Sequence, residues 1–482
     1  MKSAILSALL ALLVLLPAGC MLAGCMKVQR YHPAPLAPSA TAASLEAHSL
    51  ANPALRPFLQ RGLGQKLSTW PQQSWNLRML MLAALYYNPA LSQARARVSF
   101  AKAAVVTANE RPNPTFHLQP GIPSPYLFAL NLLFPIRTAG RRKIMVAQAQ
   151  DLTLAARLSL AQTTWQVCSG VRAAVVSDLM ATRKVRLLRA QEQLQAHRVL
   201  LLRQRLAAGE ISRPMLASAQ LALLQSRIAF EAARSRIPES RAALAAAIGV
   251  PDTALAGIHL VWPTFGHPPP AHSISPTQIQ REAVLNRLDV RKALAQYAAT
   301  QSALQLQIAK QHPDFQLGPG YDFEEGSNYF TLAYSVTLPI FNRNQGPIAQ
   351  AQAQRKAAAA AFLATQAGAI AQSEEALARY RAAWRTLTGS EQALLQLSHQ
   401  VIPKERSTVA AGQAGPLALN AVLLQKPGLA LAWLTALGQT QSALGALEDS
   451  VQRPLQPDEI LLRVAPNSAP HSAHSPMQKR TP

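Results

Sequence analysis

The clearest chemistry in this sequence is acylation of a cysteine thiol near the N-terminus. An apolar segment of 13 residues, Ala4 to Leu16, is followed by two cysteines, Cys20 and Cys25. The stretch Leu22-Ala23-Gly24-Cys25 fits the bacterial lipobox, whose cysteine is lipidated and becomes the mature N-terminus. Pro17 makes the motif that ends at Cys20 a poorer match, and either cysteine remains a candidate. We expect a cleaved signal peptide, lipidation at Cys25 and an exported lipoprotein of the outer membrane.

Other residues that could do chemistry have simpler structural explanations. The Glu324-Glu325 pair lies between two expected strands and is expected to be a solvated loop. His471 and His474 have a metal-ligand spacing but lie in a Pro- and Ser-rich tail, and Cys168 is expected to be a packed small side chain on a long helix. No Gly-x-Ser-x-Gly, phosphate-loop or His-Glu-x-x-His motif occurs. We therefore expect no enzyme activity, no metal site and no cofactor.

Composition narrows the class of protein further. The 482 residues hold 47 Lys and Arg against 23 Asp and Glu, a net charge of +24, yet only 15% of them are charged and 49% are hydrophobic. Three cysteines exclude a disulfide-dense scaffold. The basic charge alone would suit nucleic acid, but an exported lipoprotein meets little of it. We therefore expect no nucleic-acid partner.

The strands carry the most informative pattern. Large apolar side chains alternate with small or hydroxylated ones over nine residues, which is typical of a membrane-spanning β-strand. The expected membrane-facing residues are Phe330, Leu332, Tyr334, Val336 and Leu338. A half-buried sheet of a soluble protein shows the same alternation and is the alternative. Four strands cannot close a barrel, but three copies would supply twelve.

The long helices and an internal repeat give the architecture. Residues 141–208 hold no Pro and one Gly, which predicts a helix on the order of 100 Å long. A second helix is expected over about 212–248. Four landmarks recur at offsets of 199, 204, 206 and 203 residues: Pro114 and Pro313, Pro135 and Pro339, Gly140 and Gly346, Gly209 and Gly412. We infer an internal duplication.

The expected domain boundaries follow from these elements. They are a signal peptide (1–24), a lipidated N-terminal tether (25–70), a first structural repeat (71–249) with a strand pair at about 114–135 and a helical hairpin at about 141–249, a Pro-rich linker (250–275), a second repeat (276–450) with a strand pair at about 313–339 and a hairpin at about 347–450, and a flexible C-terminal tail (451–482).

These features together resemble the TolC-like family of outer membrane efflux proteins over about residues 70–450. The motifs that carry the resemblance are Tyr87-Asn88-Pro89-Ala90-Leu91, Asn286-Arg287-Leu288-Asp289-Val290, Ala208-Gly209-Glu210-Ile211-Ser212 and the stretch Leu338-Pro339-Ile340-Phe341-Asn342-Arg343-Asn344-Gln345-Gly346. The last of these is most similar to the cobalt-zinc-cadmium efflux branch. The resemblance implies a mainly α fold with a transmembrane β part: helical hairpins forming a periplasmic α-barrel, and four strands per chain in a 12-stranded trimeric β-barrel.

The resemblance also implies function, partners and sites. It implies a homotrimeric exit duct in outer membrane lipid, working with a periplasmic adaptor and an inner-membrane pump of the resistance-nodulation-division type, with heavy-metal cations as cargo. The implied adaptor contacts are the hairpin tips, Gly209, Glu210, Ser212, Arg213, Gly412 and Gln413. The implied periplasmic constriction is Leu417, Leu419 and Asn420, where no carboxylate follows the second tip, unlike many members of the family.

Charge leaves the cargo open. Arg141, Arg142 and Lys143 directly follow the first strand pair, where a cationic girdle could meet anionic lipid headgroups. A basic duct does not attract metal cations and would suit anionic or complexed substrates better. A multidrug or secretion duct of the same fold therefore remains an alternative. A structural coiled-coil lipoprotein without a pore is another, although it has no use for the alternating strands.

Overall fold

The computed structural model describes residues 29–121 and 127–456, which fall into two units, Met1–Ala47 and His48–Pro482. The predicted signal peptide, Cys20, Cys25 and the His471/His474 pair lie outside the described residues. In the first unit the chain forms α2 (Pro38–Glu46), in which Pro38 supplies a helical first residue and the Thr41 hydroxyl donates to the Pro38 carbonyl over 2.9 Å. Everything below concerns the second unit.

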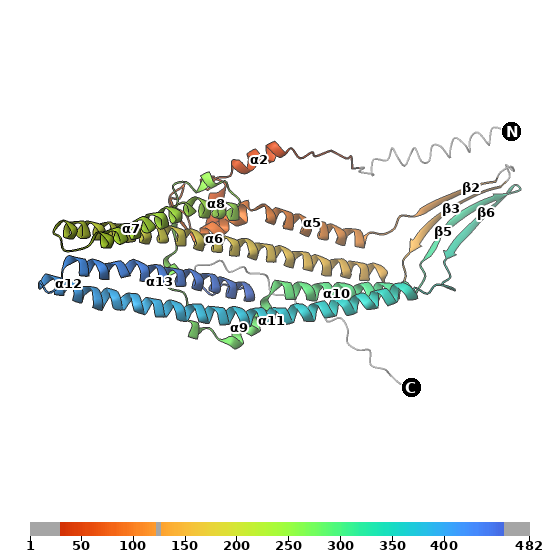
Figure 1. The fold of residues 1–482 in the computed structure, drawn as a ribbon. Helices are drawn as coiled ribbons and strands as arrows, with labels where there is room; N and C mark the ends of the chain where they lie inside the picture. Colours follow the sequence, from red (N-terminus) through yellow and green to blue (C-terminus); the bar gives the residue numbers. More distant parts are fainter. Residues whose placement is uncertain (1–28, 122–126, 457–482) are drawn as a thin grey trace. The chain divides into compact units, whose positions relative to one another are not determined.

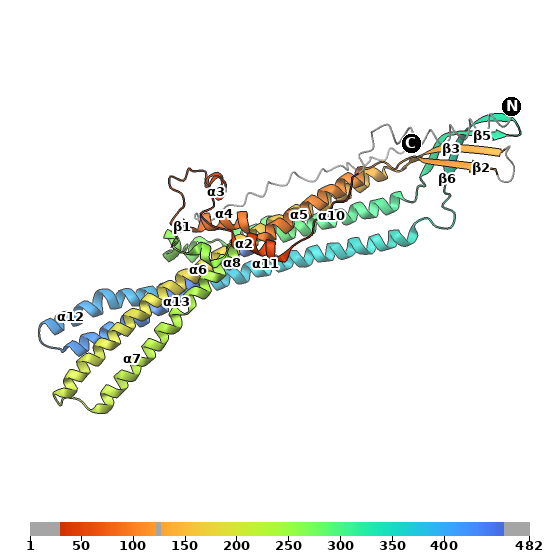
Figure 2. The same cartoon turned by 90° about the horizontal axis from the view of Figure 1, so that it is seen from above.

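Two halves of the second unit have the same order of long elements (Figures 1 and 2). The first half comprises α3 (Leu55–Leu63), β1 (Ser74–Asn76), α4 (Leu77–Tyr87), α5 (Pro89–Asn109), β2 (Thr115–Pro120), β3 (Leu127–Ile136), α6 (Arg141–Ala207), α7 (Arg213–Arg234) and α8 (Arg236–Ile248). The second comprises β4 (His259–Val261), α9 (Pro276–Asn286), α10 (Leu288–Ala309), β5 (Phe315–Glu324), β6 (Ser327–Val336), α11 (Gln345–Gln396), a π-helical turn (Leu397–Val401), α12 (Ile402–Ala410) and α13 (Pro416–Val451).

Prolines explain where the long helices are interrupted. A helix expected over 212–248 is divided into α7 and α8, because Pro238 in the first turn of α8 has no N–H to donate to the preceding turn. In the second hairpin the π-helical turn ends at Val401, and Pro403 in the first turn of α12 likewise has no N–H to donate to that preceding turn. Both hairpins then reverse at glycines with left-handed backbone, Gly209 (φ 75°) and Gly412 (φ 74°).

The motifs at the start of the two repeats, which contain Asn88 and Arg287, form hydrogen bonds to distant segments. Asn88 caps α5 by accepting from the Ala90 N–H (3.0 Å), while its own amide donates to the Ala247 carbonyl (3.0 Å) at the end of α8. Arg287 holds both carboxylate oxygens of Asp289, at 2.9 and 2.6 Å, and donates to the Gln372 side chain on α11 over 2.8 Å. Each motif therefore ties the start of a helix to a distant part of its own half.

The four long strands form one antiparallel sheet in the order β2-β3-β5-β6. Its register places directly opposite one another Leu118 and Leu130, Phe128 and Phe323, Leu317 and Tyr334, and Tyr321 and Phe330. Opposed residues share a face, and the side chain alternates every residue. Most of the large apolar side chains of the four strands therefore lie on one face of the sheet, and Leu127, Leu133 and Tyr329 lie on the other.

Helices of the second unit pack mainly against α6. It contacts α5 and α10 toward the sheet, α4 and α8 at its middle, and α7 and α13 toward the hairpin ends (Figure 2). The principal apolar core lies at the middle of α6, where Leu59, Leu80, Ile248 and Phe265 are fully buried with Val171. The segment expected as a linker, 250–275, is part of this core, since Phe265 is buried there and β4 pairs in parallel with β1.

One helix among the described residues, α13, is long and apolar enough to cross a membrane by length and composition alone. It packs along α6 and α11, and its last turns bury Glu448 against Arg172. In the described structure α13 is therefore one helix in a layer of packed helices.

Candidate functional site

The open sheet is the first part of the candidate site. None of the described helices of the second unit covers either face of it (Figures 1 and 2). On β6, Phe330, Leu332 and Tyr334 are 89%, 72% and 61% exposed, although they belong to the apolar face. Val336 is half-buried at the strand end, and Leu338 lies exposed just beyond it. A face of this composition needs cover that the described helices of the second unit do not give it.

Close packing inside the sheet fixes its register. A Cβ on Gly318 would lie 1.7 Å from the carbonyl oxygen of Leu132, and one on Gly320 would lie 2.2 Å from the side-chain oxygen of Asn131. Aromatic pairs also connect neighbouring strands: the ring centroids of Phe315 on β5 and Tyr334 on β6 lie 5.7 Å apart. The side facing away from the apolar face carries polar residues: His117, Asn131, Asp322, Thr331 and Ser335.

The junction between sheet and helices is held by one carboxylate. Asp314, just before β5, accepts from the Arg141 guanidinium and from the Thr138 backbone N–H, at 2.7 and 2.8 Å. Arg141 also donates to the carbonyls of Ala309 and His312. The Arg141 guanidinium thus binds groups of the same chain, which corrects the expectation that it belongs to a cationic girdle. Arg142 is half-buried, and Lys143 is exposed.

The two hairpin tips lie at the opposite end from the sheet. Gly209, Glu210, Ser212 and Arg213 are all exposed, and so are Gly412 and Gln413 at the second tip. Glu210 faces Arg205 across 3.6 Å. The tips are neighbours, because a Cβ on Gly415 would lie 3.0 Å from the guanidinium of Arg205.

The predicted constriction residues lie on the first turns of α13 and differ in their contacts. The Asn420 side chain is buried and donates to the Leu194 carbonyl on α6 over 3.2 Å. Leu417 packs on the small cluster of Val199, Leu202 and Ala219. Leu419 is half-buried. Asn420 and Leu417 thus hold the second hairpin against α6, and the constriction stays a prediction.

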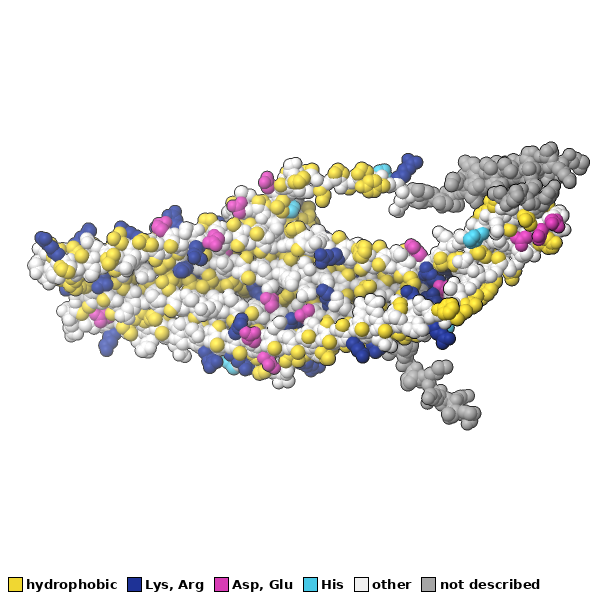
Figure 3. Space-filling view, turned by 45° about the vertical axis from the view of Figure 1, so that its right-hand side comes forward, with side chains coloured by type: hydrophobic (Ala, Val, Ile, Leu, Met, Phe, Trp, Pro, Cys, Tyr) yellow, Lys and Arg dark blue, Asp and Glu magenta, His cyan; other side chains and the backbone are white. Residues whose placement is uncertain are grey.

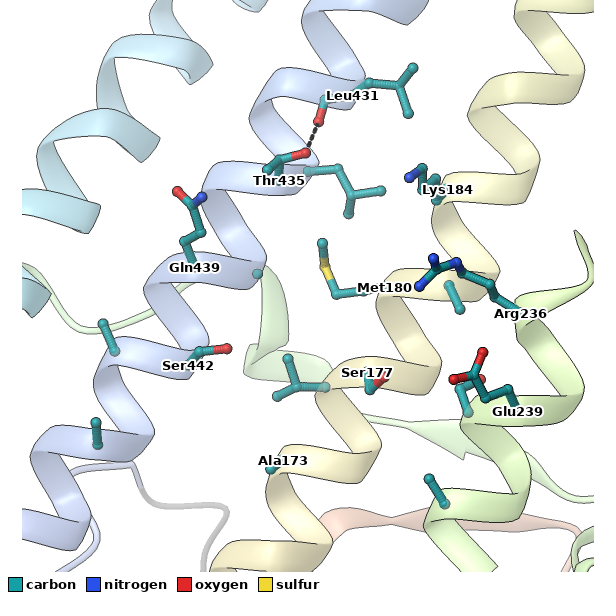
Figure 4. Close-up of a pocket in the computed structure, with 18 of the residues that line it drawn as sticks. Ala173, Ser177, Met180, Lys184, Arg236, Glu239, Leu431, Thr435, Gln439 and Ser442 are labelled. Atoms are coloured by element: carbon teal, nitrogen blue, oxygen red, sulfur yellow. Dashed lines mark hydrogen bonds between the residues drawn. The ribbon is translucent and has the colours of Figure 1, made fainter. Parts of the chain in front are cut away.

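A cavity of about 790 Å³ lies between α6, α8 and α13 (Figure 4). Small and apolar side chains of α6 and α13 face each other across it, and Met180 fills the space over Gly438, where a Cβ would be 2.6 Å from its terminal carbon. Lys184, Arg236 and Glu239 lie on the side formed by α6 and α8 (Figure 4). The cavity is a gap in helix packing around Gly438. Within residues 29–121 and 127–456, no group of three His, Cys, Asp or Glu side chains is placed to bind a metal ion.

Sequence reasoning missed a buried ion cluster. Arg172 on α6 pairs with Glu448 and lies 3.7 Å from Asp449, both on α13. Asp449 also accepts from the Trp165 indole N–H (2.8 Å) and the Ser169 hydroxyl (2.7 Å). The sequence shows the carboxylate pair Glu448-Asp449 near the end of a mostly apolar helix. It does not indicate that the pair contacts Arg172, which lies far away in the sequence.

Known proteins share this fold. No family model matches the chain. The cobalt-zinc-cadmium resistance protein CzcC of Cupriavidus metallidurans is 25% identical over 234 residues, 48% of this chain and 54% of that protein. The chain thus matches about half the length of that curated relative. Among solved structures, the outer membrane protein VceC of Vibrio cholerae has a TM-score of 0.61 at 17% identity, covering 79% of this chain and 97% of VceC. CusC, described in terms of transmembrane channel formation, has a TM-score of 0.61 at 16% identity, covering 78% and 91%.

Sheet, hairpins and these likenesses define the class: the chain has the fold of outer membrane channels. The resemblance to TolC-like outer membrane efflux proteins, predicted from the motifs, is confirmed at the level of the fold, and the curated relative belongs to cobalt-zinc-cadmium resistance. At 16% and 17% identity, these solved structures establish a likeness of fold.

Proposed function

We propose that the chain is the outer membrane exit duct of a tripartite efflux system. It conducts passively, and an inner-membrane pump of the resistance-nodulation-division type supplies the energy. The observation that carries the proposal is the four-stranded sheet, apolar on one face and uncovered, joined directly to two long helical hairpins. Apolar-out and polar-in alternation is what a lipid-embedded strand needs.

The edges of the sheet support assembly into a trimer. Its outer strands, β2 and β6, each have one neighbour among the described strands. Unpaired backbone groups at those edges are costly in lipid, because no water is present to satisfy them. Three copies joined edge to edge close a barrel of twelve strands with an aqueous lumen lined by residues such as Thr331 and Asn131.

The exposed tips suit the adaptor contact. Glu210, Ser212 and Arg213 offer charged and hydroxyl groups on a rigid turn, and Gly412 and Gln413 expose backbone beside them. A lipidated Cys25 would add an anchor in the same membrane as the sheet.

Heavy-metal cations are the proposed cargo, on the strength of the likeness to CzcC. The +24 charge favours a second candidate, a duct for anionic or organic compounds. Deleting the gene and measuring growth inhibition by zinc, cobalt, cadmium and copper beside dyes, detergents and antibiotics separates the two. Sensitivity to metals alone supports metal efflux, and sensitivity to organic compounds alone overturns it while leaving the duct in place.

The duct itself is tested by the mass of the mature protein in detergent. Three chains per particle, with ion conductance after insertion into a planar bilayer, is the expected result. A mass of one or two chains would instead favour the structural lipoprotein without a pore.

A further inference from the structure

We propose that the chain carries a binding belt for anionic phospholipid headgroups of the periplasm-facing leaflet. This proposal rests on the outer membrane location proposed above. The junction belt consists of Arg111, Arg137, Arg142, Lys143, Lys310 and Arg343.

The belt follows the boundary between sheet and helices. The chain crosses that boundary four times, and each crossing carries an exposed cation: Arg111 between α5 and β2, Arg137 between β3 and α6, Lys310 between α10 and β5, and Arg343 between β6 and α11. Figure 3 shows dark blue side chains gathered where the sheet meets the helices, and acidic ones at the far end of the sheet. Those acidic residues are Asp322, Glu324 and Glu325. The two ends of the sheet therefore differ in the sign of their charge.

The described carboxylates near the junction do not pair with the belt cations. The junction carboxylate Asp314 is taken by Arg141, which is not a belt residue. Glu110 is the other carboxylate in the described crossings, and only its carbonyl meets a belt residue, Arg137, at 3.5 Å. Within the described part of the chain no ion pair involves Arg111, Lys143, Lys310 or Arg343.

An apolar anchor lies beside one of these cations. Leu338, Ile340 and Phe341 are 66%, 66% and 97% exposed, directly before Arg343. The segment is nevertheless held in place, because the Asn344 amide donates to the Gln307 carbonyl over 2.6 Å. An aromatic and apolar cluster next to a cation is the composition that proteins place at a membrane interface. The sheet's apolar face leads directly into it.

The occupant must bring negative charge. In the proposed trimer each copy adds the same cations to the junction, so contacts between copies do not neutralise the belt. Acidic phospholipid headgroups supply phosphate at the level where an apolar face ends, and each basic residue near such a surface strengthens binding about fivefold. Anionic lipid therefore fits the junction belt better than another protein copy does.

A tryptophan reporter tests the proposal in the full mature chain. Phe341→Trp places an indole at the junction, and the protein is reconstituted in phosphatidylcholine with brominated phosphatidylglycerol or brominated phosphatidylcholine as the quencher. The ratio of quenching gives the local preference for the anionic lipid. We expect a preference well above one for the reporter protein. Adding Lys143→Gln, Lys310→Gln and Arg343→Gln should lower it by about fivefold for each cation removed, to a limit of one. Raised salt should lower it as well.

A matched control removes the same charge elsewhere. Lys66→Gln, Lys404→Gln and Arg406→Gln on the reporter background change exposed residues away from the junction and should leave the preference intact. Equal quenching by both lipids, or an unchanged preference in the belt variant, overturns the belt while the membrane location stands. No quenching by either lipid overturns the membrane location and the belt together.

Discussion

Arg141 opens the longest helix of the chain with its guanidinium 2.7 Å from the carboxylate of Asp314, which precedes β5. The pair joins the first repeat to the second at the point where helices become strands. Thr138 adds a backbone N–H to the same carboxylate. This ion pair and its hydrogen bonds therefore connect the start of α6 to the start of β5.

We therefore predict that Asp314→Asn and Arg141→Gln are coupled. Either change alone should lower the thermal stability of the purified protein. The pair should show a coupling energy of about 0.5–3 kcal/mol in a double-mutant cycle measured by thermal unfolding. Strictly additive effects would mean that the pair is not formed in solution. Glu375→Gln, which breaks an exposed pair with Arg379 on α11, is the control and should change stability by less than about 1 kcal/mol.

Gly318→Ala should disrupt the sheet. Its Cβ would meet the Leu132 carbonyl oxygen at 1.7 Å, and backbone cannot give way as a flexible side chain can. Overpacking of this kind costs about 1–3 kcal/mol or more. We expect loss of the trimer on a non-denaturing gel. Gly346→Ala, where a Cβ meets nothing within 4 Å, should assemble normally. Normal assembly of both variants would contradict the observed register of β3 and β5.

Periodicity predicted the elements that depend on local pattern. The alternation at Phe330, Leu332 and Tyr334 placed these residues together on one apolar face, because side-chain direction in a strand has a fixed period. The lack of Pro over 141–208 likewise predicts one long helix, and in the structure α6 ends at Ala207. Whether that face meets lipid, and whether the tips meet an adaptor, remain predictions.

What sequence could not supply were contacts between distant segments. The π-helical turn before Pro403, the pairing of β4 with β1 and the burial of Phe265 each depend on tertiary packing. In the sequence Arg141 is one of three adjacent basic residues, and only the structure shows that it forms an ion pair with Asp314. The same holds for Asn420, which the motif placed in a constriction and the structure packs on α6.

A charge on one face of β6 should be tolerated far less than on the other. Leu332→Arg puts a guanidinium on the apolar face, which costs about 2–4 kcal/mol at the middle of a bilayer. Thr331→Arg, its neighbour on the polar face, should insert as the wild type does and alter only conductance. Membrane fractionation and single-channel recording distinguish the two. Equal insertion of both variants would argue for a sheet that never enters lipid.

One buried and one half-buried carboxylate should give opposite pH responses. Burial raises the pKa of Asp178, although the Ser240 hydroxyl and Arg241 partly oppose it. For Asp289 burial also acts upward, but the hydrogen bonds and charge of Arg287 outweigh it and hold the pKa below its usual value.

A raised folded-state pKa means that the native state binds the proton more tightly, so Asp178 reduces stability as pH rises from about 4 through its folded pKa. A lowered one means that the stability Asp289 contributes is present above about pH 4 and is lost as pH falls through its folded pKa. Asp178→Asn should therefore raise stability at neutral pH, and Asp289→Asn should lower it. Thermal melts from about pH 3 to 7 check both directions. A shift of the same sign in the two variants would contradict these assignments.

Breaking the buried ion cluster should have the largest effect on stability. Glu448 is fully buried and pairs with Arg172, and its second oxygen accepts from the Leu455 N–H over 2.7 Å. Glu448→Gln removes the fully buried carboxylate that pairs with Arg172, whereas Asp449 lies 3.7 Å from the guanidinium and is partly exposed. Removing one partner of a buried pair typically costs about 3–5 kcal/mol, because the remaining charge is uncompensated.

Since α13 is fixed to α6 by this cluster, we expect a lower unfolding temperature and faster proteolysis of the segment after Val451. Arg172→Met together with Glu448→Leu, which removes both charges, should recover most of the loss. Failure of that double variant to recover stability would show that the cluster positions α13 by its geometry rather than by balancing its charge.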